Sequence, residues 1–220
     1  MIQHGLQELA AVLFKVGAVK FGAFRLKLHE THPDAPLSPI FFNLRTADNP
    51  KPGPLRASDL AMIAEGFEQM IARDKICYDG VCAIPNAGTP FATTLQERSN
   101  GQLQIVELAK QDNGTKRRID GVLAKGGLHR GARVLLIDDV VTGADTKIEA
   151  IKVLRDAGFV VSDLLIIVDR QQDKGRETVE AQNVRIHSLF TMRDLIAFYF
   201  LRQWIGQDKH REVLAYLGLD

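Results

Sequence analysis

The chain has 220 residues, enough for one large α/β domain or two small ones around a buried core. It is 45% hydrophobic and 25% charged, which excludes a wholly disordered or fibrous protein. With 28 Lys and Arg against 27 Asp and Glu, the formal net charge is +1, so charge gives no reason to expect a nucleic acid or an anionic membrane as partner.

Cysteine use and hydropathy predict the cellular compartment. The two cysteines, Cys77 and Cys82, are too few for a disulfide framework and wrongly spaced for a CxxC metal site. No apolar run approaches the roughly 20 residues of a membrane span. Charged residues also interrupt the apolar N-terminal residues, where a secretory signal needs an unbroken stretch. We therefore expect a cytoplasmic protein.

Two patterns occupy the first 54 residues. Leu6, Leu9 and Leu13 recur with helical spacing. Apolar and polar residues alternate over 24–29, which is typical of a half-buried strand, and SPIFFNLR (38–45) is a second strand candidate. The Pro-rich stretch 50–54 ends regular structure. Residues 1–54 are therefore expected to form a small hood of helix and strands beside a core of residues 55–220.

From residue 55 onward, short apolar runs alternate with helical patterns. The runs are 80–84, 103–107, 133–138, 164–169 and 184–189, and the helical patterns are one with Ser58 as its N-cap and others near 91–98, 145–157 and 192–204. Thr191 and Asp194 have capping-box spacing before the last helix. Uncharged, β-branched runs alternating with helices indicate an α/β fold with a parallel sheet flanked by helices on both faces.

The segment 133–158 carries the most informative pattern. A buried strand ends in two adjacent acids, Asp138 and Asp139, and a turn of small and hydroxyl-bearing residues leads into a helix. In an open α/β sheet, ligands bind at the carboxyl ends of the strands. A helix N-terminus offers backbone N–H groups and favours an anion. Because nearby acids can accept sugar hydroxyls or lie beside a magnesium ion, the layout suits a phosphorylated sugar.

A plainer interpretation stays open, in which the acids end a strand and Thr142 or Asp145 caps the helix. Against it, paired acids beside a buried strand repel each other and are costly to desolvate without partners. The GxxxxGK[ST] pattern of a nucleotide P-loop is absent from the chain. A response-regulator receiver can also begin with VLLIDD, but only 82 residues follow Asp138, which is short for such a domain.

VLLIDDVVTGADTK (134–147) resembles the phosphoribosyl pyrophosphate (PRPP) motif of type I phosphoribosyltransferases. The resemblance implies that Asp138 and Asp139 hold the ribose hydroxyls. It also implies a 5-phosphate loop made of Thr142, Gly143, Ala144, Asp145 and Thr146. The family commonly has glycine where this chain has Ala144, so the loop backbone is expected to differ in shape.

Four further segments resemble orotate phosphoribosyltransferases in the same chain order. They are FGAFRLKL (21–28) with SPIFFNLR (38–45), IPNAGTPFA (84–92), IIVDRQQDKGRE (166–177) and TMRDLIAF (191–198). The first implies a PRPP- or base-contacting Lys27 and base-contacting Phe41 and Phe42. The second implies a pyrophosphate-binding turn that includes Asn86, Ala87 and Gly88, and the third implies that Arg170 reads the orotate.

These residues also have plainer interpretations. Lys27 on an alternating strand is often solvated, and Arg170 could pair with Asp169. Phe41 and Phe42 are adjacent and face opposite sides of a strand, so we expect at least one of them in the core.

The stretch 110–133 contains seven Lys and Arg against two acids. In the family, a mobile loop closes over pyrophosphate, often from the neighbouring subunit, and its equivalent here is the stretch 107–127. The resemblance implies that Asp138, Asp139, Lys116 and Arg118 are catalytic and that Lys110 and Arg117 bind substrate. Here the histidine of the family's KxHG segment is absent, Asp120 precedes Gly121, and Ala87 stands where many members have lysine.

The resemblance implies a type I phosphoribosyltransferase that works as a homodimer. Its reaction is the Mg²⁺-dependent transfer of 5-phosphoribosyl from PRPP to orotate, which gives orotidine 5′-phosphate and pyrophosphate in pyrimidine biosynthesis. Asp138 and Asp139 would hold the magnesium indirectly, through PRPP or water. Two alternatives stay open because the loop departs from the family pattern. One is a transferase for another base, and the other is a non-catalytic regulatory protein that binds PRPP.

Overall fold

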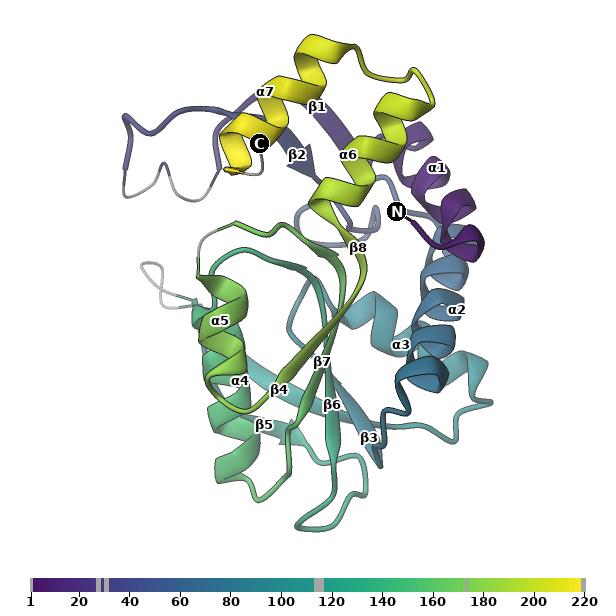
Figure 1. The fold of residues 1–220 in the computed structure, drawn as a ribbon. Helices are drawn as coiled ribbons and strands as arrows, with labels where there is room; N and C mark the ends of the chain where they lie inside the picture. Colours follow the sequence, from purple (N-terminus) through teal and green to yellow (C-terminus); the bar gives the residue numbers. More distant parts are fainter. Residues whose placement is uncertain (1, 27–28, 30–31, 113–116, 173, 219–220) are drawn as a thin grey trace.

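The computed structural model describes the chain except residues 1, 27, 28, 30, 31, 113–116, 173, 219 and 220. Its main sheet has the strand order β5-β4-β3-β6-β7-β8 (Figure 1). The strands are β3 (Gly80–Ala83), β4 (Gln104–Asp112), β5 (Arg117–Ala124), β6 (Val134–Val141), β7 (Asp163–Asp169) and β8 (Arg185–Thr191). All neighbouring pairs are parallel except β4–β5, which is antiparallel. The predicted α/β sheet is confirmed.

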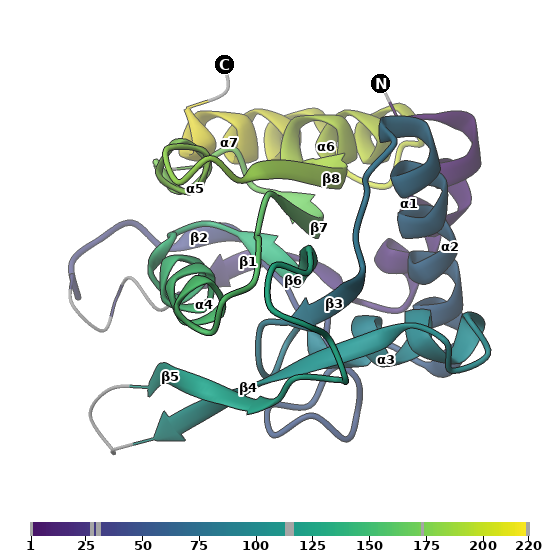
Figure 2. The same ribbon diagram turned by 90° about the horizontal axis from the view of Figure 1, so that it is seen from below.

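Helices cover both faces of this sheet (Figure 2). They are α1 (Gln7–Lys15) after a short 3-10 turn η1 (His4–Leu6), α2 (Ala57–Asp74), α3 (Thr89–Arg98), α4 (Asp145–Asp156), α5 (Gly175–Glu180), α6 (Met192–Leu201) and α7 (Gln207–Leu217). Alternate residues of β6 enter different cores. Leu135 and Ile137 pack with residues of α1, α2 and α3, whereas Leu136 packs with residues of α4. Burial on both faces explains why these strands are uncharged runs.

A second, two-stranded sheet joins β1 (Val19–Phe24) and β2 (Ser38–Phe42) in antiparallel register. It lies beyond the carboxyl ends of the parallel strands, where α6 continues from β8 and α7 packs on β2 (Figure 1). Both termini of the chain therefore contribute to this region. The division into a hood of residues 1–54 and a core of residues 55–220 stays a prediction.

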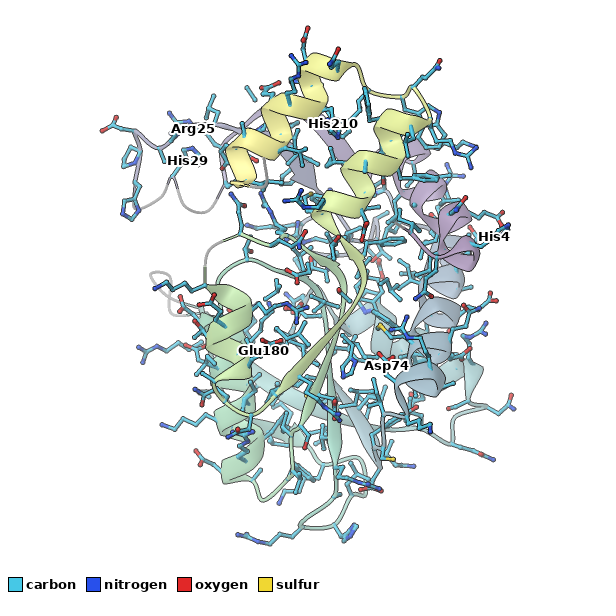
Figure 3. The ribbon with its side chains drawn as sticks, viewed as in Figure 1. His4, Arg25, His29, Asp74, Glu180 and His210 are labelled. Carbon is cyan, nitrogen blue, oxygen red and sulfur yellow. The ribbon has the colours of Figure 1, made fainter. Side chains whose placement is uncertain are left out.

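Several predicted boundaries differ from the structure. Residues 25–26 do not extend β1, because a local turn forms in which His29 N–H donates to Leu26 O at 2.9 Å and the His29 ring accepts the Leu26 N–H at 2.9 Å. Figure 3 shows His29 and Arg25 on the loop between β1 and β2. Arg56, not Ser58, is the N-cap of α2, and its N–H donates to Asp59 Oδ2 at 2.9 Å. The Thr191 cap is confirmed, since its hydroxyl accepts the Asp194 N–H.

The stretch 107–127, expected as a mobile loop, forms mostly a β-ribbon in its described residues. β4 continues to Asp112 and β5 returns from Arg117, with register shifts at Glu107/Leu108 and Ala109/Lys110. No helix in the described part of the chain combines the length and hydropathy that a membrane span requires.

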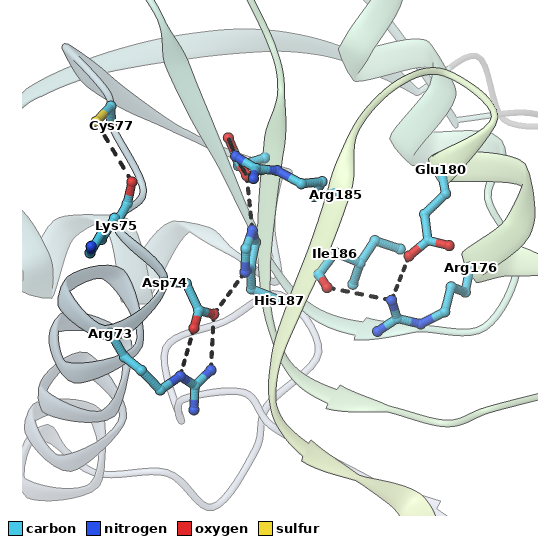
Figure 4. Close-up of polar contacts among 10 residues, drawn as sticks. Arg73, Asp74, Lys75, Cys77, Arg176, Glu180, Arg185, Ile186 and His187 are labelled. Atoms are coloured by element: carbon cyan, nitrogen blue, oxygen red, sulfur yellow. Dashed lines mark hydrogen bonds and ion pairs between the residues drawn. The ribbon is translucent and has the colours of Figure 1, made fainter.

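A polar network fastens α2 to the edge of the sheet (Figure 4). His187 on β8 places Nδ1 3.0 Å from Asp74 Oδ2 and Nε2 2.8 Å from Asp163 Oδ1. Figure 3 shows Asp74 and Glu180 on either side of β8. Arg73 pairs with Asp74 at 2.6 Å, and this hydrogen bond, followed by the one from His187, lowers the pKa of Asp74 to about 2. Each ring nitrogen of His187 thus lies within hydrogen-bonding distance of a carboxylate, one on α2 and one on β7.

We expect His187→Phe to lower the free energy of unfolding by about 2 kcal/mol and Tm by about 4–8 °C, because the ring then donates to neither acid. Asp163 is buried, so losing a donor is costly there. Thermal unfolding measures the effect, with His4→Phe at an exposed position as the control. Equal Tm values for the two variants would show that the network contributes nothing to stability.

Candidate functional site

The carboxyl ends of β3, β6 and β7 lie next to one another, so the turns that follow these strands meet at one edge of the sheet. Two glycines show that these turns pack closely against one another and against β6. A Cβ on Gly88, after β3, would lie 2.4 Å from Ile137 O of β6. A Cβ on Gly175, after β7, would lie 1.8 Å from Thr142 O after β6. The three segments predicted to bind pyrophosphate, ribose phosphate and base are therefore brought together.

Asp138 and Asp139 lie near the carboxyl end of β6, which continues past them to Val141, and their surroundings differ. Asp138 is buried, and its carboxylate accepts hydrogen bonds from Lys147 Nζ at 2.6 Å and from Asp139 N–H at 2.9 Å. Asp139 is half-buried, and its Oδ1 accepts the Val140 N–H at 2.7 Å. The two acids are not equivalent, because a buried lysine engages only the first.

The electrostatics at Asp139 are unfavourable to its charge. The pKa of Asp139 is raised to about 7, mainly because the carboxyl is buried and secondly because Asp138 is charged. The positive charges of Lys147 and Arg45 lower this pKa. Arg45 follows β2, so the N-terminal segment brings positive charge toward the acids. Such a strongly shifted carboxyl at the end of a sheet strand is typical of a functional site.

The turn 142–146 leads into α4, whose N-terminus has no side-chain cap. Gly143 and Asp145 are exposed and Thr142 and Thr146 are half-buried. Ala144 is the N-cap residue with φ −105°, a conformation that needs no glycine, so the departure from the family pattern causes no backbone strain. The uncapped N–H groups of this turn and helix suit a phosphate.

The turn 85–88 adjoins the basic ribbon. Lys110 of β4 donates from Nζ to Pro85 O at 2.6 Å. Asn86 is exposed, and its carbonyl accepts from Asn49 Nδ2 at 3.2 Å. Ala87 is half-buried and Gly88 is buried. Lys110 therefore contacts the turn 85–88, which the sequence predicts to bind pyrophosphate.

Arg170 follows β7 and is buried. The preceding Asp169 accepts hydrogen bonds from Arg176 Nε at 2.7 Å and from Gln171 N–H at 2.9 Å. Arg176 also pairs with Glu180 at 2.6 Å. The turn that carries Arg170 is thus fastened to α5.

The other predicted residues are more scattered. Phe42 packs against the larger core, as expected for one member of its pair, while Phe41 contacts Phe24 with ring centroids 5.5 Å apart. Arg118 is exposed on β5. Arg117 begins the same strand, but its side chain lies outside the described residues, as do Lys27 and Lys116 altogether.

Three residues of the site were not predicted. Lys147 lies on the buried stripe of α4 with Ala150, Ile151 and Leu154, so its helical spacing could have identified it. Arg45 lies within SPIFFNLR but carries no local sign of its position near Asp139. Glu149 Oε2 accepts the Ile119 N–H at 3.2 Å and ties α4 to the ribbon, a contact that spans 30 residues of sequence.

A cavity of about 510 Å³ lies elsewhere, at the start of β8. It is lined by Ser162, Glu180, Asn183, Val184 and Arg185. Since this is the opposite end of the strand from the turns described above, we assign the cavity no part in the site.

We expect Gly175→Ala to lower the free energy of unfolding by about 1–3 kcal/mol, because the added methyl group requires the turn or α5 to move. Gly206→Ala is the matched control, since a Cβ there meets nothing within 4 Å. Thermal unfolding of both variants tests the expectation. Equal stability would contradict the close packing of α5 on the turn.

The chain is similar to proteins of known activity over most of its length. The bovine (Bos taurus) uridine 5′-monophosphate synthase is 32% identical over 212 residues, which are 96% of this chain and 40% of that protein. The orotate phosphoribosyltransferase of Pyrobaculum islandicum is 29% identical over 204 residues, which are 93% of this chain and 95% of that protein. This chain therefore spans about two fifths of the bovine protein and nearly all of the Pyrobaculum protein.

Solved structures agree on the fold. The crystal structure of orotate phosphoribosyltransferase from Aeropyrum pernix matches with a TM-score of 0.64 and 24% identity, and the match covers 86% of this chain and 97% of that chain. No protein-family model matches the chain.

Proposed function

Since the chain belongs to the orotate phosphoribosyltransferase family, we propose that it transfers the 5-phosphoribosyl group of PRPP to orotate. One observation carries the proposal. The buried strand β6 carries Asp138 and the half-buried Asp139 near its carboxyl end, and a short turn leads from Val141 into the uncapped N-terminus of α4. Turns from the two neighbouring strands border this point on either side. Such an arrangement would offer N–H groups of the α4 N-terminus to an anion and carboxylate oxygens to hydroxyl groups. Arg170, in the turn after β7, would add a guanidinium.

The ribose 5-phosphate would bind in the turn 142–146, where N–H groups and the helix dipole favour an anion. A carboxylate of the acid pair would accept the ribose hydroxyls, because ionised acceptors form the stronger hydrogen bonds. The sugar would then lie with its anomeric carbon toward the turn 85–88.

Pyrophosphate would leave against the turn of Asn86, Ala87 and Gly88 and the basic ribbon. Lys110, Arg117 and Arg118 belong to this ribbon, and Lys116 precedes Arg117 in the sequence. As the base nitrogen bonds to the anomeric carbon and loses its proton, the bond to pyrophosphate breaks and its electron pair stays on the pyrophosphate oxygen. Cationic side chains placed there stabilise that developing charge, and a ribbon that covers the site excludes water.

The base would contact Arg170, whose forked guanidinium matches a planar carboxylate. Phe41, Phe42 and Lys27 are the candidates for the remaining contacts. Support comes from the burial of Arg170 at the carboxyl end of β7, one strand from the paired acids.

Magnesium fits this site only as an ion held largely by the substrate. The described residues contain no group of three or more His, Cys, Asp or Glu side chains that could hold a metal ion. Asp139, with Asp138 behind it, could hold Mg²⁺ through PRPP or water, as hard oxygen ligands do. Bound there, the ion would neutralise charge on the pyrophosphate.

A panel of bases tests the substrate. Purified protein with PRPP and Mg²⁺ should release pyrophosphate with orotate and not with other pyrimidines or purines. Faster release with a different base would support the second candidate, a transferase with another acceptor, which the altered loop favours. PRPP binding without pyrophosphate release for any base would indicate a regulatory protein.

The family resemblance also supports a homodimer with sites at the interface, for which sedimentation equilibrium is the test. A monomer under assay conditions would contradict that part of the proposal. The cytoplasmic location stays a prediction.

PRPP affinity should depend on pH near neutrality. Because the pKa of Asp139 is raised to about 7, the carboxyl is protonated and uncharged below that pH and ionised above it. We expect the KM for PRPP to rise as pH falls from 8 to 6, by up to about tenfold per pH unit. The Asp139→Asn variant is the control. Its side chain does not titrate, so the pH dependence that remains in it is that of the substrate. A wild-type profile that matches this variant would contradict the assignment.

A further inference from the structure

Lys147 and Asp138 form an ion pair inside the protein. The Lys147 Nζ lies 2.6 Å from Asp138 Oδ2, and the two side chains are only 7% and 6% exposed. Lys147 comes from the first turn of α4, directly after the proposed phosphate turn, and Asp138 from the carboxyl-terminal half of β6. The pair therefore connects the two elements that border the ribose.

Both carboxylate oxygens of Asp138 are occupied by protein groups, because Oδ1 accepts the Asp139 N–H at 2.9 Å. Asp139 differs. Among the described residues, its carboxylate accepts one hydrogen bond, from the Val140 N–H. Asp139 is also the more exposed of the two acids. The two adjacent carboxylates therefore differ in what they bind: Asp138 bonds to protein groups, whereas Asp139 has acceptor capacity left for a ligand.

We propose that Lys147 is a positioning residue of the PRPP site, which neutralises and fixes Asp138 so that Asp139 alone offers a carboxylate to the ribose hydroxyls. This inference rests on the proposed function. Without the ammonium, two adjacent carboxylates would share the end of one buried strand, where each repels the other and lacks a partner. With it, the acid pair and the lysine carry one net negative charge, and the loop that begins α4 is held against β6.

A buried ion pair can also serve stability alone, so the test must separate the two roles. We would compare Lys147→Met, Asp138→Asn, Asp139→Asn and the double variant Asp138→Asn/Lys147→Met. Titration calorimetry with PRPP and Mg²⁺ measures binding without any base, and thermal unfolding measures stability in parallel. Where turnover occurs, the KM for PRPP and kcat are measured as well.

Lys147→Met should weaken PRPP binding by about tenfold or more, because it leaves a buried carboxylate uncompensated beside Asp139. It should raise the KM for PRPP by a similar factor and leave kcat within about threefold, since the ribose contacts form on binding. The double variant removes both charges and should recover most of the lost affinity. Asp139→Asn should weaken binding whether or not the ion pair is present.

Two results would overturn the inference. The first is PRPP binding by Lys147→Met within about twofold of wild type, even with a lowered Tm, which would leave the pair a purely structural role. The second is an Asp138→Asn variant that loses as much affinity as Asp139→Asn and gains nothing from Lys147→Met, which would make Asp138 itself a ribose ligand. If Lys147→Met fails to fold, the PRPP affinities of Asp138→Asn and of the double variant still distinguish the two roles. Failure of orotate turnover would reject the proposed base and leave this binding test intact.

Discussion

Replacing Asp139 by asparagine is expected to lower kcat/KM for PRPP by about a hundredfold. The carboxylate would accept two ribose hydroxyls, hydrogen bonds to a charged group are worth about 1.5 kcal/mol each, and about 1.4 kcal/mol corresponds to a factor of ten. Asparagine keeps the shape and one acceptor but loses the charge.

Steady-state kinetics at saturating base measures the effect, and isothermal calorimetry separates binding from chemistry. Asp156→Asn, at the exposed end of α4, is the matched control and should leave both unchanged. A loss of less than about threefold in Asp139→Asn would mean that the ribose lies elsewhere.

Removing the guanidinium of Arg170 should abolish most recognition of the base. A bidentate guanidinium–carboxylate contact in a buried setting is worth about 3 kcal/mol, so we expect Arg170→Ala to raise the KM for orotate by about a hundredfold. The KM for PRPP should change by less than about threefold, because the sugar and its phosphates would bind at the ends of β6 and β3 and not at the turn after β7 that carries Arg170.

Arg170→Lys retains the positive charge but lacks the bidentate guanidinium, so it should recover only part of the lost orotate affinity. Equal losses for orotate and PRPP in Arg170→Ala would indicate that the residue supports the whole edge of the sheet and does not read the base. Arg176→Ala separates these roles further, because it releases Asp169 while keeping the Arg170 side chain.

The sequence predicts the core of this fold well where burial is two-sided. The runs in β6 and β7 are uncharged because both faces are covered, and that pattern requires no knowledge of the partners. The paired acids and the turn that follows them are local in sequence, but β6 continues past the acids to Val141, so the predicted strand end is wrong by three residues. Ala144 departs from the family residue, yet its negative φ shows that the turn does not need glycine there.

Elements with one exposed face are missed or misplaced. β5 buries Ile119 within a polar, basic stretch, so no apolar alternation marks it as a strand. The strand predicted over 24–29 ends at Phe24, because the His29 ring accepts the Leu26 N–H; residues 27 and 28 lie outside the described residues. These structures depend on contacts and hydrogen bonds that hydropathy does not encode.

Sequence reasoning proposes site residues where they follow one another in the chain, and it does not reach contacts made by distant segments. Lys147 had a readable signal, since it shares the buried stripe of α4, but a lysine on an apolar face invites the assumption that it is solvated. Arg45 and Glu149 had none, because their positions depend on how the small sheet and the ribbon pack against the main sheet.

The most direct test of the account follows orotate itself. Pure protein with PRPP, Mg²⁺ and orotate should deplete orotate absorbance and form orotidine 5′-phosphate and pyrophosphate in equal amounts, with product identity established by mass spectrometry. Omitting PRPP should stop the reaction, and Asp139→Asn should slow it. Unchanged orotate after prolonged incubation at high enzyme concentration, in protein shown by calorimetry to bind PRPP, would contradict the proposed transfer.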